Sequence, residues 1–525
     1  MGIPYYFSYL VKNNPDLLVE FQNLNKKVDN FYLDCNSIIY DNLRNIEYTN
    51  NKNAFENKLI IETCHKINEY IEFINPNKQI IIAFDGVAPV AKLNQQRNRR
   101  HKSCFEKDVI CSFKKNDSWS SLNITPGTHF MKKLNIEIKN YFNKTKYKSK
   151  CLIYASDEPG EGEHKLFEYI RKNSKKHKEE ITIIYGIDAD LIMLSLYHHT
   201  ICKNIFLYRE TPYFIKSINN SLESDKCYIM HIPRLANEII LKMNDYKEYD
   251  QIEHKNRLYD YLLLCFLLGN DFMPHCPYIN IRTNGIDILM KHYLYLFKNT
   301  KENLSDGKKI NWNNLRKLFA EIIKNEKTYL INDFEIRNKL EKRQLKTKTI
   351  EDKIEYMNHI PYKNRNTEML IHPKHENWKK RYYKYLFHVD NINEYKQKIC
   401  TNYFEALEWT FKYYTDSCYD WRWSYQYHYS PLFSDLIHYI PHFNTPFVEK
   451  KPKNPISTKI QLAYVIPEKY NFILNDDNII NKINQNRDLF YSQELCFHWE
   501  FCKYFWEGHI ELPQPSIDTI ERVLS

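Results

Sequence analysis

Four short apolar runs in the first 190 residues of the chain each end beside acidic residues. The runs occupy residues 30–33, 79–84, 151–154 and 181–187, and stretches with helical periodicity separate them. Short apolar runs bounded by turn residues are typical of buried strands, and their alternation with helices is typical of a parallel sheet. The pattern therefore predicts an α/β fold with a mostly parallel central sheet flanked by helices.

The acidic residues follow these runs at the point where each predicted strand ends. They are Asp34, Asp85, Asp157, Glu158, Glu161, Glu163, Asp188 and Asp190, and Asp271 follows a helix-like apolar run at 261–268. Because ligands of open α/β sheets bind outside the carboxyl ends of the strands, these side chains should converge on one crevice. A single acid after a strand is commonly a helix N-cap, and an acidic turn alone is commonly solvated. The set as a whole favours a cation site, because carboxylates held close together need an opposite charge.

Hard oxygen ligands are typical of Mg²⁺ or Mn²⁺ sites. A crevice with several carboxylates can hold two such ions ~3.5–4 Å apart, one activating water and the other stabilising the leaving oxygen of a phosphodiester. The basic segment 92–115 follows Asp85 and is predicted to be a helix. One face of that helix carries Lys92, Gln96, Arg99 and Arg100. The guanidinium groups on this face could bind a phosphate at two points.

Residues 371–445 are dense in aromatic side chains, and polar and aromatic residues alternate in the segment 420–431. Aromatic residues at this density usually form a core, but alternation leaves ring faces available to stack on bases. Carboxylates, a cationic helix and aromatic rings together favour a metal-dependent phosphodiesterase that acts on nucleic acid.

Charge and cysteine content narrow the class of protein further. The net charge is +10 although many acids are drawn into one predicted crevice, which favours a polyanionic partner. The 13 cysteines form no CxxC pair, which favours reduced thiols in an intracellular protein and argues against a zinc site. No apolar stretch is long enough for a transmembrane helix, so no membrane partner is expected, and the N-terminus lacks the features of a signal peptide.

Several motifs resemble those of the Xrn-type 5′→3′ exoribonucleases, in the same order along the chain. They are FYLDCNSIIY, IIAFDGVAPVAKLNQQRNRR, PGEGEHK, GIDADLIML and LLGNDFMPH. The start MGIPYYFSYL is also similar to that family, and RYYKYLF with WRWSYQYHYSPLFSDL resembles its second conserved region. The resemblance covers residues 1 to about 445, and PGEGEHK together with GNDFMPH makes it specific.

The resemblance implies a PIN/FEN-like nuclease core with an aromatic-rich, largely helical second region. We expect a nuclease domain at 1–295, a helical linker at 296–370, and the second conserved region with a C-terminal helical part at 371–525. The implied activity is processive hydrolysis of single-stranded RNA with a 5′-monophosphate to nucleoside 5′-monophosphates, with Mg²⁺ or Mn²⁺ bound as two ions. The residues that would bind metal are Asp34, Asp85, Glu161, Glu163, Asp188, Asp190 and Asp271.

The same resemblance assigns a 5′-phosphate pocket to Lys92, Gln96, Arg99 and Arg100. Such a pocket is expected to exclude capped and triphosphate ends, which links the chain to a decapping enzyme in mRNA decay. The family stacks the first bases between a histidine and a tryptophan. Here Tyr40 occupies the histidine position, and the tryptophan is Trp421 or Trp423, with Trp423 favoured. Tyr40 can stack as a histidine does, but it carries no positive charge near neutral pH.

The long C-terminal extension of the cytoplasmic family members is missing, so we expect a short-form monomer without partners for that extension. The abundance of Asn, Lys, Ile and Tyr is typical of AT-rich coding, as in some viruses and protists. No nuclear-import cluster stands out, which favours a cytoplasmic location. For a viral protein this would be the host cytoplasm, and a nuclear location stays open.

Two other hypotheses stay open. One is a flap or structure-specific endonuclease of the related FEN-like superfamily acting on DNA, which would release oligonucleotides rather than mononucleotides. The other is a non-catalytic RNA-binding scaffold, which predicts the loss of metal-binding carboxylates. All seven carboxylate positions are filled in this sequence.

Overall fold

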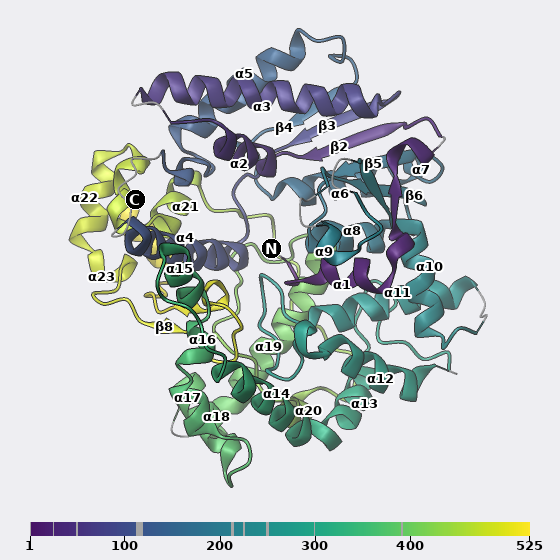
Figure 1. Cartoon of the computed structure of the whole chain (residues 1–525), viewed down its shortest axis with the longest axis vertical. Helices are drawn as coiled ribbons and strands as arrows, with labels where there is room; N and C mark the ends of the chain where they lie inside the picture. The colour runs from purple at the N-terminus through teal and green to yellow at the C-terminus, as the bar shows by residue number, and fades with distance from the viewer. Residues whose placement is uncertain are drawn as a thin grey trace.

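In the computed structural model, the described residues are 2–24, 26–48, 51–111, 119–211, 215–223, 226–247, 251–298, 300–389 and 392–525. A seven-stranded sheet lies in one half of the molecule, and helices from the middle and the end of the chain fill the other half (Figure 1). This architecture confirms the expected α/β fold with its largely helical second region. The domain boundaries expected at residues 295 and 370 stay predictions.

The strands in chain order are β1 (Leu18–Glu20), β2 (Asn30–Asp34), β3 (Gln79–Ala83), β4 (Cys151–Tyr154), β5 (Ile181–Tyr185), β6 (Asn204–Tyr208) and β7 (Tyr228–His231). Their order across the sheet is β1-β7-β6-β5-β2-β3-β4. The pairs within β2–β6 are parallel, and β7 is antiparallel to both β6 and β1. The register aligns Asp34 of β2 with Ala83 of β3, and Leu33 with Tyr185 of β5. The carboxyl ends of these strands are therefore level, so the residues that follow them lie at one edge of the sheet.

Helices cover both faces of the sheet. The helices of this part of the chain are α1 (Tyr6–Asn13), α2 (Asn36–Asn45), α3 (Lys52–Ile74), α4 (Val90–Cys111), α5 (His129–Asn143), α6 (Gly162–Lys172), α7 (Ser174–His177), α8 (Ala189–His198), α9 (Ile215–Ile218), α10 (Ile232–Met243) and α11 (Gln251–Phe266), and α4 is the exception described below. Tyr32 and Ile184 pack with α6, α8 and α11, whereas Phe31 and Ile183 pack with α2, α3 and α5. This division follows from the two-residue period of a strand.

The second region continues the core on the α6 and α8 side of the sheet. Its elements are α12 (Gly285–Phe297), α13 (Trp312–Ile322), α14 (Glu326–Glu341), α15 (Ile350–Asn358), α16 (Ile360–Lys363), α17 (Asn366–Ile371), α18 (Trp378–Phe387), α19 (Ile392–Thr415), α20 (Phe433–Tyr439), α21 (Thr458–Val465), α22 (Asp477–Gln485), α23 (Arg487–Phe490), α24 (Ile517–Leu524) and the ribbon of β8 (Phe497–His498) with β9 (His509–Ile510). Side chains of α19, such as Trp409 and Phe411, share one apolar cluster with Leu166 of α6 and Leu191 of α8. In the described part of the chain, no helix is long and apolar enough to cross a membrane.

Helix α4 packs on the C-terminal helices rather than on the sheet, and Figure 1 shows it beside α21. Arg97 donates hydrogen bonds to the carbonyls of Phe490 (2.5 Å) and Pro513 (2.6 Å). Lys102 donates to two carbonyls, one of them that of Trp506 at 2.5 Å. Residues 490–513 therefore hold α4, which is formed by residues 90–111.

The sequence pattern also predicts a helix over residues 5–18, and the helix found there is shorter. α1 ends at Asn13, because Pro15 lacks a backbone N–H and disfavours helical backbone in the residue before it. Pro15 begins the 3-10 turn η1 (Pro15–Leu17), and Leu18 already belongs to β1. The helix expected at 92–115 is α4 as far as Cys111, and residues 112–118 lie outside the described residues.

Candidate active site

Two of the predicted carboxylates, Asp34 and Asp85, meet the start of helix α6. Asp34 ends β2, and Asp85 follows β3 by two residues. Asp85 accepts hydrogen bonds from the backbone N–H of Gly162 (2.7 Å) and from the side chain of Asn36 (2.6 Å). A Cβ atom at Gly162 would lie 2.6 Å from Oδ1 of Asp34, which is closer than side chains approach. The first turn of α6 therefore needs a glycine in order to sit against both strand ends.

Four more carboxylates lie at the N-terminal ends of two helices. Glu161 is the N-cap residue of α6 and Glu163 lies in its first turn, whereas Asp188 and Asp190 hold the same places in α8. Asp188 accepts a hydrogen bond of 2.9 Å from the N–H of Leu191, so it also acts as a helix cap. The N–H groups and the dipole of each helix stabilise negative charge at these ends.

The acids of the segment 157–163 divide into two pairs. Glu161 and Glu163 are buried, with 5% and 6% of their surface exposed, whereas Asp157 and Glu158 are exposed. Asp157 lies 3.7 Å from the ammonium of Lys139 at the surface. Only the buried pair therefore belongs to the crevice, as the assignment from the sequence requires.

Burial and mutual repulsion make the ionised form of these carboxylates unfavourable unless a cation lies beside them. Burial raises the pKa of Asp34, and the neighbouring Asp85 and Asp188 raise it further. Burial also raises the pKa of Glu163, to which Asp190 adds, and burial raises the pKa of Asp190 itself to about 6. One oxygen of Asp34, Oδ1, is buried without a hydrogen-bond donor. A bound cation would remove both the repulsion and the unsatisfied oxygen.

One buried cation, Lys92, lies inside the cluster. Its ammonium is 2.6 Å from Oε2 of Glu161 and 2.9 Å from Oδ2 of Asp271. Burial lowers the pKa of Lys92, but the charges of Asp271 and Glu161 outweigh burial and hold it well above its usual value. Burial raises the pKa of Asp271, but neighbouring positive charges, Lys92 first among them, together outweigh burial and hold this pKa well below its usual range. The structure thus places Lys92 among the carboxylates, and its predicted contact with a phosphate stays a prediction.

Two consecutive tyrosines of α19 donate hydrogen bonds to these carboxylates. The hydroxyl of Tyr413 donates to Oε1 of Glu161 at 2.8 Å, and that of Tyr414 donates to Asp190. The ring of His164 stacks on Tyr413, with centroids 3.7 Å apart and an angle of 26° between the planes. Sequence reasoning missed both tyrosines, because in an aromatic-rich segment no spacing or motif separates a ligand-orienting tyrosine from a core tyrosine. It also missed His164, although this residue directly follows Glu163 in the motif PGEGEHK.

The donor set fits a hard divalent cation. Ligand atoms of Glu161, Glu163 and His164 all lie within 4.8 Å of one another. Burial lowers the pKa of His164 well below its usual value, so its imidazole is neutral. Carboxylate oxygens far outnumber this single nitrogen, which favours Mg²⁺ or Mn²⁺ over zinc.

A cavity of about 290 Å³ lies along α4 and is lined by Tyr40, Arg99 and Arg100. Arg100 is buried, and its Nη1 has no hydrogen-bond acceptor. Burial lowers the pKa of Arg100 to about 10, so its guanidinium is charged at neutral pH and needs an anion. The structure therefore brings these three predicted residues to one cavity, while Lys92 and Gln96 are not part of its lining.

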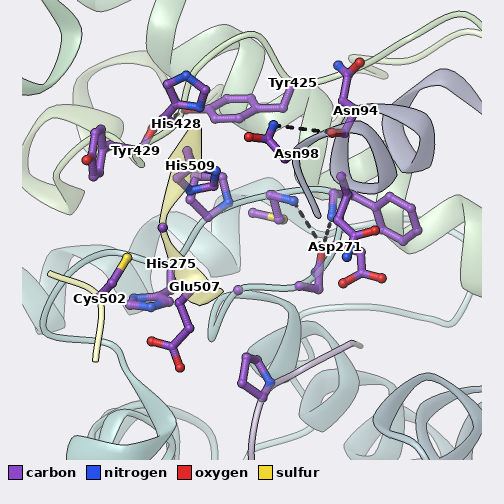
Figure 2. A pocket seen from close by; sticks show the side chains of 18 of the residues that line it. Asn94, Asn98, Asp271, His275, Tyr425, His428, Tyr429, Cys502, Glu507 and His509 are labelled. Atoms are coloured by element: carbon purple, nitrogen blue, oxygen red, sulfur yellow. Dashed lines mark hydrogen bonds between the residues drawn. The ribbon is translucent and has the colours of Figure 1, made fainter. Parts of the chain in front are cut away.

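A larger cavity of about 560 Å³ extends from Asp271 along another side of α4. Figure 2 shows Asn98 of α4 facing Tyr425 and His428 of the second region across this space. Amides and aromatic rings are the groups that hydrogen-bond and stack on nucleobases. Arg99 lines both cavities, so they adjoin at this residue.

Trp423 is linked to the carboxylates through a stack of rings. It lies over Trp409 (centroids 5.3 Å apart), which in turn lies over Tyr413 (4.9 Å). Trp423 is half-buried, whereas Trp421 is buried. Tyr40 lines the smaller cavity and Trp423 lines neither of the two cavities, so their pairing as base-stacking residues stays a prediction.

The fold and the carboxylate cluster define an α/β protein with a candidate cation site at the carboxyl ends of its parallel strands. The family model described as the XRN 5′-3′ exonuclease N-terminus matches residues 1–211, and the model of the Xrn1 helical domain matches 251–372 and 363–519. The chain belongs to the Xrn family of 5′→3′ exonucleases, which confirms the resemblance seen in the motifs.

Individual relatives are similar over large parts of the chain. A 5′-3′ exoribonuclease 1 from Homo sapiens is 28% identical over 89% of this chain and 30% of its own length. A 5′-3′ exoribonuclease 2 homolog from Drosophila melanogaster is 26% identical over 98% of this chain and 69% of its own length. A 5′-3′ exoribonuclease 1 from Saccharomyces cerevisiae is 31% identical over 59% of this chain and 22% of its own length. The chain thus spans less than a third of the human and yeast relatives.

Proposed function

We propose that this chain is a divalent-metal-dependent 5′→3′ exoribonuclease that hydrolyses 5′-monophosphorylated RNA to nucleoside 5′-monophosphates. The observation that carries the proposal is the cluster of buried carboxylates in which Lys92 contacts Glu161 and Asp271, together with a cavity in which Nη1 of Arg100 has no acceptor. The names of the curated relatives support the same activity.

The carboxylates of the cluster would hold Mg²⁺ or Mn²⁺, and two ions suit their number. Such ions would polarise the scissile phosphodiester and lower the pKa of the attacking water. Tyr413 and Tyr414 orient two of the carboxylates, and Lys92 balances part of their charge. The site therefore places negative charge where cations and a phosphate must meet.

Arg99 and Arg100 would bind the 5′-phosphate and so set the 5′→3′ direction of the proposed reaction. Both line the smaller cavity, beyond Lys92 along α4, so a terminal phosphate bound there would leave the next phosphodiester near the carboxylates. Guanidinium groups suit this role because they bind a phosphate through two parallel hydrogen bonds. The aromatic and amide groups of the larger cavity would contact the nucleosides.

The wider setting follows from the proposed chemistry. A single-stranded RNA with a free 5′-monophosphate is what a decapping enzyme leaves, so we propose that the chain acts after such a step in mRNA decay. We further propose that the chain works as a monomer. Its proposed compartment is the cytoplasm, or the host cytoplasm if the protein is viral, and the nucleus is the alternative.

One digestion tests the proposal. A labelled RNA with a 5′-monophosphate or a 5′-hydroxyl end is incubated with the chain, with Mg²⁺ or with EDTA. Mononucleotides from the monophosphate form, in Mg²⁺ alone, are expected. Internal cuts that ignore the 5′ end would favour a flap-type endonuclease, and binding without products would favour a scaffold.

A further inference from the structure

The two edges of the parallel sheet carry opposite charges. The seven residues that follow each of the parallel strands β2–β6 contain eight acids and one arginine in all, a net charge of −7. The seven residues that precede each of the same strands contain eleven lysines and four acids in all, a net charge of +7. The candidate cation site lies at the carboxyl edge, and the opposite edge, which we call the amino edge, is therefore positive.

Backbone contacts place the segments of the amino edge side by side. The N–H of Lys78, before β3, donates to the carbonyl of Asp29, before β2, at 2.8 Å, and the N–H of Asp29 donates to the carbonyl of Ile181 of β5 at 3.0 Å. The side chain of Asn204 of β6 donates to the carbonyl of Glu179 at 3.3 Å. Neighbouring strands lie about 4.8 Å apart, so the five segments form a row ~19 Å long. Figure 1 shows α2, which follows β2, and α7, which precedes β5, at opposite edges of the sheet.

The lysines of the amino edge are exposed, and most of them form no ion pair. Ten of the eleven are exposed, and Lys150 is half-buried. Among the described residues of this edge, Lys78 is the one lysine in an ion pair, with Asp29 (3.1 Å) and Glu180 (3.0 Å). The remaining ammonium groups form a positive surface that raises the local concentration of a polyanion.

The kind of cation at the amino edge indicates the kind of anion. All of its positive residues are lysines, and none is an arginine. An ammonium group binds as a point charge, whereas a guanidinium group binds a phosphate in one fixed geometry. The edge therefore suits phosphates at variable positions along a flexible strand. Contacts of this kind hold a nucleic acid without reading its sequence.

We propose that the amino edge binds the backbone of the RNA downstream of the nucleotides that occupy the crevice. The inference rests on the proposed function, which supplies a single-stranded RNA whose 5′ end lies at the carboxyl edge. β2 has five residues, so the two edges are ~17 Å apart along the strands. An RNA long enough to pass from one edge to the other is held at two places, and the second contact keeps it bound while each product leaves the crevice.

Binding of two RNAs to the full chain in EDTA tests this contact. Both carry a 5′-monophosphate and the same repeated sequence, but the short RNA fills only the two cavities and the long RNA extends well beyond them. Fluorescence anisotropy gives the Kd of each at several salt concentrations. Each phosphate contact of a single strand contributes about −0.7 to the slope of log K against log salt, so the loss of three lysines should make the slope for the long RNA shallower by about 2.

The test variant combines Lys175→Gln, Lys176→Gln and Lys178→Gln, in and directly after α7. We expect a shallower salt slope and a higher Kd for the long RNA, whereas the Kd of the short RNA stays the same. The same three positions changed to arginine keep their charge and should keep the slope of the wild type.

The matched control removes three exposed lysines of the second region, in and after α14. It combines Lys339→Gln, Lys342→Gln and Lys346→Gln. The net charge of the chain falls by the same amount as in the test variant, so an effect of total charge would appear in both. We expect the control to leave both salt slopes unchanged.

Several outcomes would overturn the inference. Equal salt slopes for the short and the long RNA in the wild type show that no contact lies beyond the cavities. Equal changes in the test and control variants show an effect of net charge alone. An unchanged slope in the test variant also overturns it. A lower Tm would then assign these lysines to the negative end of the α6 dipole, and lost binding to vesicles of anionic phospholipid would assign them to a membrane surface.

Failure of the proposed function is a separate result. If neither RNA is digested in Mg²⁺, the nuclease activity is absent. The salt slopes measured in EDTA do not depend on cleavage, so they still decide whether the amino edge binds RNA.

Discussion

The hydroxyl of Tyr413 donates a hydrogen bond of 2.8 Å to Oε1 of Glu161, and the two residues are 252 positions apart in the chain. The bond joins α19 of the second region to the start of α6 at the end of the sheet. A buried carboxylate oxygen that loses such a donor is destabilised by about 1–3 kcal/mol. Tyr413 is therefore a positioning residue for Glu161, and the second region completes a site whose carboxylates come from the first.

We predict that Tyr413→Phe lowers Mg²⁺ affinity or kcat about 10- to 100-fold while KM for RNA stays the same. The phenyl ring keeps the stack with His164, so the effect comes from the missing hydroxyl. Magnesium titrations of activity measure the change. Tyr382→Phe is the matched control, because its buried hydroxyl donates to the carbonyl of Ser430 at 2.8 Å. Equal losses in the two variants would point to general destabilisation.

Glu163→Gln and Asp188→Asn should each abolish turnover and leave the fold and RNA binding largely intact. Each replaces a negative oxygen that a cation needs with a neutral amide of the same shape. Single-turnover digestion measures turnover, and gel shift with circular dichroism measures binding and fold. Glu158→Gln changes an exposed acid of the same segment and should keep full activity. Substantial activity in either of the first two variants would count against the cation site.

Lys92→Met should destabilise the metal-free protein by about 3–5 kcal/mol, because it leaves buried carboxylates without their cation. Added Mg²⁺ should restore part of this loss, since it supplies positive charge to the same groups. Urea unfolding in EDTA and in Mg²⁺ measures both effects. A variant as stable as the wild type in EDTA would show that the ion pairs with Glu161 and Asp271 do not balance the cluster.

The raised carboxyl pKa values predict opposite responses to pH with and without metal. Burial raises the pKa of Asp190 to about 6, and burial also raises those of Asp34 and Glu163. The folded state then binds more protons than the unfolded state between about pH 4 and 6, so the metal-free protein loses stability as pH rises through this range. Magnesium binds the ionised form, so its affinity should rise with pH through about 6. Thermal unfolding and metal titrations from pH 5 to 8 measure the two trends.

Arg99→Ala should reduce the preference for 5′-monophosphate over 5′-hydroxyl RNA, because one guanidinium of the smaller cavity is lost. The ratio of kcat/KM on the two RNAs measures this preference. RNA binding by the wild type should also weaken as salt rises, since phosphate contacts release counterions. Arg487→Ala, which removes a surface ion pair with Glu468, should leave the preference unchanged. Equal losses on both RNAs in Arg99→Ala would contradict the assigned role.

The central strands could be predicted because each is a continuous apolar run that ends at a polar residue. The strands β2, β3, β4 and β5 follow this rule, and their alternation with helices fixes a parallel sheet. The edge strand β1 could not be predicted, because its three residues carry no periodicity of their own and depend on pairing with β7. The expected helix over 5–18 is shorter for a different reason, because Pro15 ends it and the residues that follow form a 3-10 turn and a strand.

The carboxylates could be predicted because each stands next to its own strand or helix end. The contacts of Lys92 could not be predicted, because helical spacing places it with Arg99 and Arg100, whereas its ammonium contacts Glu161 and Asp271. Tyr413 and Tyr414 could not be predicted as hydrogen-bond donors to the carboxylates for a different reason. Their partners are more than 220 residues away, and no local pattern encodes a contact over such a separation.

The anchoring of α4 has a consequence for the synthesis of the protein. Arg97 donates to the carbonyl of Phe490, 393 residues later, and Lys102 donates to that of Trp506, 404 residues later. At roughly 5–20 residues per second, a ribosome needs about 20–80 s to make the segment that separates each pair. Until then Arg97 and Lys102 lack the carbonyl groups that accept from them in the folded protein. We therefore expect α4, and with it the proposed phosphate site, to reach its folded position only after residues 490–506 have been synthesised.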